Sequence, residues 1–261
     1  MENSGIEWCK HTLNLWWGCV LVHLGCLNCY ARILALRWGF DLWGVDKPRL
    51  QVESAWRYLA KYQKKAKKAG EMHRVFINSM SDIFEKPMPL IDRKHNQLSM
   101  NTGDLRNQLF KNIDDGMYPN LMFLLLTKRP SNINKYIPDS WKENPPANVM
   151  FGTSIVDQET ANKYINQLLQ VKGKRFLSVE PQLAELTLMP WLEKKQINWV
   201  IQGGESGRCK RFFDTDWARK TKAECLATGT PYFFKQVDKV KEIPDDLKTR
   251  EFYSDDELAT F

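Results

Sequence analysis

Six short apolar runs, separated by longer amphipathic stretches, constrain the fold of this chain more than any other feature. The runs occupy residues 75–77, 121–126, 149–154, 175–181, 199–201 and 232–234. Strands that alternate with helices of about a dozen residues pair in parallel, because a parallel connection needs a crossover of that length. The pattern therefore predicts an α/β fold built on a parallel sheet.

The stretches between these runs predict the helices and the domain organisation. Apolar residues recur at helical spacing over residues 53–69, 160–169 and 216–227, and Gly70 is a plausible helix stop. Residues 86–120 are interrupted by proline and glycine, although residues 105–113 can form one helix. A chain of 261 residues has the size of one α/β barrel or of two small domains. We expect one domain over residues 1–236 and an appendage over 237–261 that closes one end of the barrel or lies over its mouth.

Polar residues follow most of the predicted strands. In a parallel sheet the carboxyl ends of the strands meet at one edge, where ligands bind. Capping of the following helix is the alternative for Ser81, Asp82 and Asp157. The residues expected at this edge are Asn78, Ser79, Ser81, Asp82, Thr127, Lys128, Arg129, Ser154, Ser178, Glu180, Glu205, Lys235 and Gln236.

Three cysteines near the start of the chain, Cys19, Cys26 and Cys29, suggest a metal centre. Three thiolates can hold three corners of an iron–sulfur cluster and leave one iron open to a small molecule. Structural zinc, completed by His11 or His23, is one alternative, and buried cysteines without a ligand are another. The remaining cysteines, at 9, 209 and 225, are scattered, and packing in the core is the better interpretation of the one at 225.

Composition indicates in which cellular compartment the chain acts and which kinds of partner it can bind. Six cysteines and a polar N-terminus without a signal peptide favour a reducing, cytoplasmic location, and no run of about 18 apolar residues is available to span a membrane. The formal net charge is +7, and five lysines lie within residues 61–68. That segment is either a solvated helix face or a patch that binds phosphate groups. Acidic residues gather between residues 245 and 257.

Other catalytic motifs are weak or absent. The run Gly203-Gly204-Glu205-Ser206-Gly207 does not fit the dinucleotide-binding pattern, and it is either a tight turn or a place where backbone approaches an anion or nucleoside. The chain has no phosphate-binding loop of the Gly-Lys-Ser/Thr type. Its four histidines accompany no evident nucleophile motif, so a hydrolytic triad has little support.

The cysteine loop and the strand-end motifs, taken in order, resemble the radical S-adenosylmethionine superfamily, and within it a phage-type family with an N-terminal three-cysteine motif. The resemblance covers roughly residues 6–236 and is carried by Ile6-Glu7-Trp8, Asn14, Gly18-Cys19, Gly25-Cys26-Leu27-Asn28-Cys29-Tyr30-Ala31, Asn78-Ser79-Met80-Ser81-Asp82, Leu126-Thr127-Lys128-Arg129-Pro130, Gly152, Ser154, Ser178, Glu180-Pro181, Gly203-Gly204-Glu205-Ser206-Gly207 and Phe234-Lys235-Gln236. It implies a partial (β/α)6 TIM-like barrel of parallel strands, with the cysteine loop, about residues 16–31, at their carboxyl end.

The resemblance also implies a cofactor. A 4Fe-4S cluster would be held by Cys19, Cys26 and Cys29, and its fourth iron would be chelated by S-adenosylmethionine. One-electron reduction would cleave that molecule to a 5′-deoxyadenosyl radical, which abstracts hydrogen from the substrate. The first gap between the cysteines has six residues where the superfamily usually has three, and Asn28 stands where an aromatic residue is common.

The resemblance further assigns roles to the strand-end residues. Those expected to bind S-adenosylmethionine are Asn78, Ser79 and Ser81 near its amino group, Ser154 and Glu180 near its ribose or carboxylate, and Gly203, Gly204 and Glu205. The catalytic candidates are Lys128 and Arg129, which can neutralise a carboxylate or phosphate, and Lys235, an alternative contact for the substrate together with Gln236.

We expect the substrate to be a nucleic acid, a nucleotide or a modified base, altered or rearranged by radical chemistry; a peptide substrate remains open. Trp16 and Trp17 can stack on a base or pack in the core. An electron donor is required, a partner protein is possible, and a phage-encoded chain would act in the host cytoplasm. Two other functions remain: a non-catalytic zinc-binding nucleic-acid module, and an iron–sulfur protein that only carries electrons.

Overall fold

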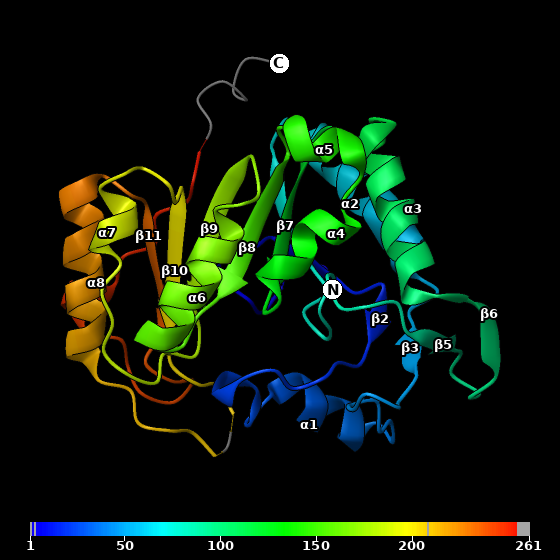
Figure 1. The fold of residues 1–261 in the computed structure, drawn as a ribbon, viewed down its shortest axis with the longest axis horizontal. Helices are drawn as coiled ribbons and strands as arrows, with labels where there is room; N and C mark the ends of the chain where they lie inside the picture. Colours follow the sequence, from blue (N-terminus) through cyan, green and yellow to red (C-terminus); the bar gives the residue numbers. More distant parts are fainter. Residues whose placement is uncertain (1, 3, 208, 255–261) are drawn as a thin grey trace.

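A parallel sheet forms the centre of the molecule. The computed structural model describes residues 2, 4–207 and 209–254, and in that part of the chain the sheet has seven strands. All neighbouring strands are parallel, and the sheet curls into a half-barrel (Figure 1). Their order is β1 (His11–Leu13), β4 (His73–Ile77), β7 (Leu121–Thr127), β8 (Val149–Ser154), β9 (Lys174–Val179), β10 (Trp199–Gly203) and β11 (Tyr232–Gln236).

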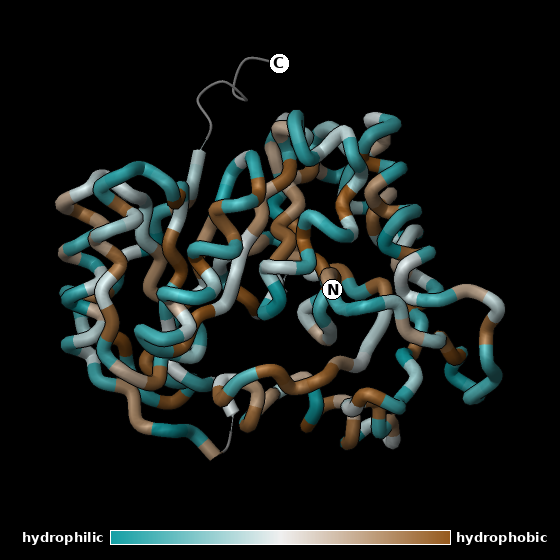
Figure 2. The backbone as a smooth tube through the Cα atoms, in the orientation of Figure 1, coloured by the Kyte–Doolittle hydropathy of each residue, from teal (hydrophilic) through white to brown (hydrophobic). Residues whose placement is uncertain are grey.

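Helices connect the strands and cover the convex face of the sheet. Side chains alternate along a strand, so Val75 and Ile77 join the helix-facing core while Phe76 faces the interior of the half-barrel. In Figure 2 most of the strand backbone is brown, whereas the helices also carry teal residues. The helices on these connections are α2 (Ala55–Ala69), α3 (Thr102–Asp114), α4 (Ile133–Tyr136), α5 (Asp139–Glu143), α6 (Gln158–Leu168), α7 (Met189–Leu192) and α8 (Thr215–Thr228).

Aromatic side chains fill part of the interior of the half-barrel. Trp8 packs against Phe76, with ring centroids 4.7 Å apart, and against Trp199 at 6.4 Å. Trp8 is 1% exposed and Trp199 is fully buried. Trp199 is the first residue of β10, whereas Phe76 lies near the carboxyl end of β4 and lines the pocket together with Trp8. The rings therefore extend through the interior from the amino ends of the strands to the pocket.

The segment after residue 236 extends this packing. It contains η3 (Asp245–Leu247), and it then runs antiparallel to the edge strand β11, because Phe234 N donates to Thr249 O and Glu251 N donates to Tyr232 O. Trp199 Nε1 donates to Glu251 O at 2.9 Å. Residues 249–251 therefore lie along the edge of the sheet near the amino end of β11, whereas Lys239, earlier in the expected appendage, lines the pocket. Residues 255–261 lie outside the described residues.

A smaller sheet and the cysteine loop occupy the connections that leave β1 and β4. The loop contains η1 (Leu24–Cys26) and leads into α1 (Tyr30–Arg37). Trp16 is fully buried in the main core, so packing rather than base stacking explains it. The smaller sheet has the order β2 (Trp16–Trp17), β3 (Arg49–Gln51), β5 (Pro89–Ile91) and β6 (Gln97–Asn101).

The structure confirms the α/β class, adds one strand to the predicted sheet and contains a smaller four-stranded sheet that was not predicted. All six apolar runs form strands of the large sheet, and the seventh strand is β1, whose three residues are too few for a periodic signal. The long helices were also predicted correctly: Gly70 ends α2 in the left-handed conformation, and Asp157 caps α6. No helix among residues 2, 4–207 and 209–254 has the length and apolarity needed to cross a membrane.

Close packing of β8 against β9 gives a test of the fold. Gly152 lies beside Phe176, and a Cβ at Gly152 would stand 2.4 Å from carbons of that ring. We expect Gly152→Ala to lower the free energy of unfolding by about 1–3 kcal/mol, because the ring must shift in a filled core. Urea unfolding followed by circular dichroism measures this, with Gly5→Ala as the control, since nothing lies within 4 Å of a Cβ there. Equal stability of the two variants would contradict the packing.

Candidate functional site

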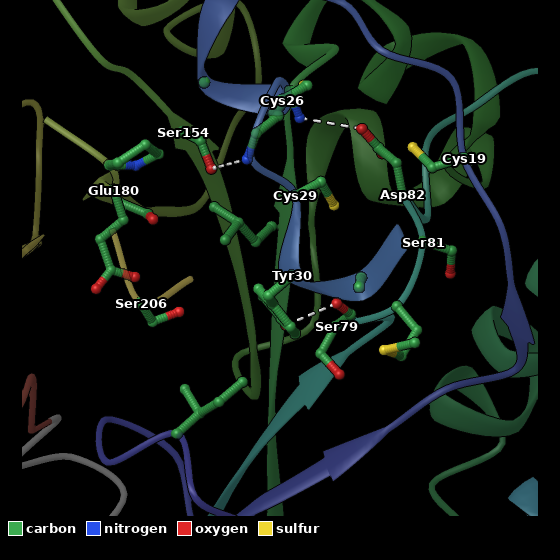
Figure 3. A pocket seen from close by; sticks show the side chains of 18 of the residues that line it. Cys19, Cys26, Cys29, Tyr30, Ser79, Ser81, Asp82, Ser154, Glu180 and Ser206 are labelled. Carbon is green, nitrogen blue, oxygen red and sulfur yellow. Dashed lines mark hydrogen bonds between the residues drawn. The ribbon is translucent and has the colours of Figure 1, made fainter. Parts of the chain in front are cut away.

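The three cysteines and most of the predicted strand-end residues line one pocket of about 250 Å³. Cys19, Cys26 and Cys29 lie toward one side, and Glu180 and Ser206 lie toward the other (Figure 3). Three predicted residues, Arg129, Gly203 and Gln236, do not line it, although each directly follows or precedes a residue that does. The predicted residues that line the pocket are Asn78, Ser79, Ser81, Asp82, Thr127, Lys128, Ser154, Ser178, Glu180, Gly204, Glu205 and Lys235.

The first cysteine is held by the backbone around it. Gly18 has φ +109°, and a Cβ there would lie 2.7 Å from Arg49 Cδ and 2.8 Å from Leu42 O, so glycine is required before Cys19. Gly44 N donates to Cys19 O at 3.1 Å. The second cysteine ends η1, and Cys29 immediately precedes α1. All six cysteines are free thiols.

The described residues do not hold a closed metal site. Within residues 4–207 and 209–254 no three His, Cys, Asp or Glu side chains are grouped as a ready set of metal ligands. The three thiols nevertheless line one pocket.

Asp82 connects the ends of β4 and β7. Its Oδ1 accepts hydrogen bonds from Phe84 N at 2.9 Å and Thr127 Oγ1 at 2.7 Å, and its Oδ2 accepts from Lys128 N at 3.1 Å and Arg129 Nη1 at 2.8 Å. Asp82 therefore joins two strand ends instead of capping a helix.

Arg129 links this carboxylate to the cysteine loop. Its Nη1 lies 3.8 Å from Cys19 Sγ, and its Nη2 donates to Val20 O at 2.7 Å. Burial raises the pKa of Cys19 to about 12, and the positive charge of Arg129 opposes that rise. Burial lowers the pKa of Arg129, but Asp82 and then Cys19 raise it more, so the guanidinium remains charged. Both terminal nitrogens of Arg129 therefore have partners in the structure.

A second buried ion pair lies behind the cysteine loop. Arg49 is fully buried, and its Nε and Nη2 donate to the two oxygens of Glu85 at 2.7 and 2.9 Å. Its Nη1 donates to Leu42 O and Lys47 O. Because the pair is bidentate, Arg49 and Glu85 largely neutralise each other while fixing the segment that follows α1.

The end of β4 directs its polar residues toward the pocket. Asn78 has φ 63°, a conformation that asparagine tolerates, and its Oδ1 accepts from Leu15 N at 2.9 Å. Its Nδ2 is buried and has no partner among the described residues. Tyr30 lines the same space and donates from its hydroxyl to Ser79 O at 2.8 Å. The helix after the cysteines is thereby joined to the end of β4.

The Gly-Gly-Glu run at the end of β10 has tight backbone contacts with β11 and the residue after it. A Cβ at Gly204 would stand 2.1 Å from Val237 O, and one at Gly203 would stand 3.2 Å from Gln236 O. The glycines therefore let the ends of β10 and β11 pack closely. Glu205 accepts from Asn28 Nδ2 at 3.0 Å and forms an ion pair with Arg211; burial raises the pKa of this carboxyl, but these bonds lower it more, so the net direction is downward.

Charged groups on the far strands face the pocket. Lys128 Nζ donates to Ser154 Oγ at 3.0 Å. Lys235 Nζ lies 3.2 Å from Glu180 Oε1, and both side chains are less than one-fifth exposed. Lys239 also lines the pocket. The pocket thus carries three ammonium groups along with its carboxylates.

The lysine-rich segment lies elsewhere. Lys61 and Lys65 form ion pairs with Glu2, whose backbone bridges to His11 at the start of β1. The lysines of α2 are exposed and none lines the pocket. This favours the solvated-face interpretation of residues 61–68.

The two histidines considered as zinc ligands differ in position. His11 is 1% exposed, stacks on Tyr62 of α2 at 4.0 Å, and its Nε2 lies 3.1 Å from His73 Nδ1. It faces the helix layer, so it is not placed to join the cysteines. His23 lies within the cysteine loop and accepts from Gly25 N at 3.0 Å through Nδ1.

Comparison with known proteins identifies the family. The half-barrel with a cysteine-lined pocket defines an α/β protein with one principal candidate site. Residues 3–252 match the family described as "Protein of unknown function (DUF5131)", and the chain belongs to that family. No curated protein matches the chain.

Several residues of the site were not found from the sequence. Two ion pairs, Arg49 with Glu85 and Arg211 with Glu205, join residues that no sequence motif connects. Tyr30 and Asn28 were noted beside Cys29, and that adjacency was the available signal for their contacts with the end of β4 and with Glu205.

Burial of His11 predicts a pH dependence of stability. Burial, and then His73, lower the pKa of His11 to about 4. As the pH falls, the His11 imidazole is therefore protonated in the unfolded chain before it is protonated in the folded protein. The stabilisation that comes from keeping His11 neutral is complete above about pH 6.5 and is lost as the pH falls toward 4. Between pH 7.5 and 4.5 we expect the wild type to lose roughly 2 kcal/mol more of unfolding free energy than His11→Gln.

Urea unfolding at the two pH values measures this difference. The exposed His95 gives the matched control, and His95→Gln should retain the wild-type pH dependence. An identical loss in His11→Gln and wild type would contradict the assignment.

Proposed function

We propose that this protein is a radical S-adenosylmethionine enzyme, a partial TIM-like barrel whose cysteine loop holds a 4Fe-4S cluster at the carboxyl ends of the strands. The observation that carries the proposal is the lining of one pocket by Cys19, Cys26, Cys29 and the polar strand ends. Thiolates are the ligands that such clusters use, and a set of three leaves one iron open.

The pocket fits the second cofactor in its chemistry. S-adenosylmethionine presents an amino group, a carboxylate, a ribose and an adenine. Buried groups that lack partners, Asn78 Nδ2 and Trp8 Nε1, are available to hydrogen-bond a ligand, and both residues line the pocket. Lys128 is suited to the carboxylate, and Glu180 to the ribose hydroxyls.

When bound, the cluster and S-adenosylmethionine together supply a 5′-deoxyadenosyl radical that removes hydrogen from a substrate. The chain positions and shields that chemistry. Tyr30 joins α1 to the end of β4 through Ser79 O, and Asn28 joins the cysteine loop to Glu205. Trp8 and Phe76 close the pocket toward the interior of the half-barrel, which limits access of water.

For the substrate we propose a nucleic acid or nucleotide. Lys128, Lys235 and Lys239 line the pocket, and one carboxylate of S-adenosylmethionine engages one of them at most. Lys235 is paired with Glu180, and Asp82 and Glu205 are paired with Arg129 and Arg211. With Lys128 on the carboxylate, Lys239 is the lining lysine left for a phosphate group. We place the reaction in the cytoplasm, of the host if the gene is carried by a phage, because a reducing environment keeps the thiols available for iron.

Zinc bound by the three cysteines and His23 is the second candidate, in a non-catalytic nucleic-acid module. His23 Nε2 is buried and has no partner among the described residues. This candidate does not use the polar residues on the opposite side of the pocket.

Metal content tests the proposal. Anaerobic purification and reconstitution should give about four irons and four sulfides per chain. Cys26→Ser should lose most of both, whereas Cys209→Ser should keep them, because Cys209 is exposed and does not line the pocket. One zinc per chain and no iron would favour the module instead. A full cluster in Cys26→Ser would show that the ligands are assigned wrongly.

Binding of a short single-stranded DNA tests the substrate class. The affinity should fall with rising salt, and Lys239→Met should weaken binding and reduce the slope of log K against log salt by about one. Lys64→Met, on the exposed face of α2, is the control and should leave the slope unchanged. Binding that is insensitive to salt, or equal loss in the two variants, would argue against a phosphate-bearing substrate in this pocket. Fluorescence anisotropy provides the measurement.

A further inference from the structure

Arg129 holds a proposed cluster ligand and the residue after it at the same time. Its Nη1 lies 3.8 Å from Cys19 Sγ, and its Nη2 donates to Val20 O at 2.7 Å. The planar guanidinium therefore contacts one side of the cysteine loop through two nitrogens. A lysine ammonium has no comparable fork.

Asp82 fixes the orientation of this guanidinium. The Asp82 Oδ2 to Arg129 Nη1 distance is 2.8 Å, and the side chains are 6% and 15% exposed, respectively. Asp82 is itself held by Thr127 Oγ1, Phe84 N and Lys128 N. Because the carboxylate cannot turn without breaking several hydrogen bonds, Arg129 is constrained to point at Cys19.

The other charged groups near Cys19 do not cancel the positive charge that Arg129 places beside its sulfur. Glu85 is the other carboxylate near Cys19, and both of its oxygens bind Arg49. Arg129 is thus the cation that contacts the Cys19 sulfur directly, whereas the charges of Arg49 and Glu85 largely offset each other.

We propose that Arg129, oriented by Asp82, is a positioning residue for Cys19 that orders the start of the cysteine loop before any cluster binds and raises the reduction potential of the bound cluster. The second part rests on the proposed function. A cation that hydrogen-bonds to a ligating sulfur stabilises the cluster that has gained one electron, and that electron comes from an external donor. No covalent bond forms or breaks in this step.

Hydrogen exchange of the full-length chain, purified without a cluster, tests the ordering. Arg129→Met should speed exchange severalfold in peptides that cover residues 18–24, and Arg129→Lys should have a smaller effect. Arg219→Met is the matched control, because Arg219 also pairs with carboxylates, Asp216 and Asp246, but lies on exposed α8. Unchanged exchange in both Arg129 variants would overturn the ordering role. Thermal unfolding shows whether each variant is folded, and the conservative lysine variant decides the matter if Arg129→Met is not.

An EPR-monitored redox titration of the reconstituted proteins, with dithionite as the reductant, tests the electrostatic part. The midpoint potential should become more negative in Arg129→Met, remain closer to the wild type in Arg129→Lys and stay unchanged in Arg219→Met. An unchanged potential in Arg129→Met would overturn this part. If the wild type takes up no cluster, the proposed function fails, while hydrogen exchange still decides whether Arg129 orders the loop.

Discussion

The ion pair between Asp82 and Arg129 connects the sheet to the cysteine loop. Asp82 follows β4 and accepts from the end of β7, while Arg129 extends from β7 to Cys19 and Val20. Removing either partner would leave a charge with little solvent around it, which is far more costly than losing a surface pair. The conformation of the loop at Cys19 therefore depends on the same residues that join two central strands.

The half-barrel leaves space for a ligand toward one end. Trp199, at the amino end of β10, packs against Trp8 in the interior, and the segment beside β11 packs against Trp199 through Phe252. The pocket is lined by Cys19, Cys26 and Cys29 together with residues that end or follow several strands of the large sheet (Figure 3). A parallel sheet brings residues far apart in sequence to one edge, which is why Lys128, Glu180 and Lys235 meet there.

The sequence predicted the elements better than their contacts. Strong apolar runs identify six strands, and helical spacing with Gly70 identifies α2, because these signals are local. The strand β1 was not predicted, because His11–Leu13 is too short to show a hydrophobic period. The link from Asp82 to Arg129 spans 47 residues and the link from Asn28 to Glu205 spans 177, so no local pattern predicts either. Polar strand ends could be assigned to one edge, but which of them face a ligand and which bind each other depends on tertiary packing.

The measurement that tests the central claim most directly is the fate of S-adenosylmethionine. The reconstituted protein is reduced with dithionite under anaerobic conditions, incubated with S-adenosylmethionine and analysed by chromatography. The account predicts 5′-deoxyadenosine and methionine in equal amounts, dependent on both the cluster and the reductant. A protein that carries four irons, accepts an electron and leaves S-adenosylmethionine intact would contradict it and would indicate an electron carrier.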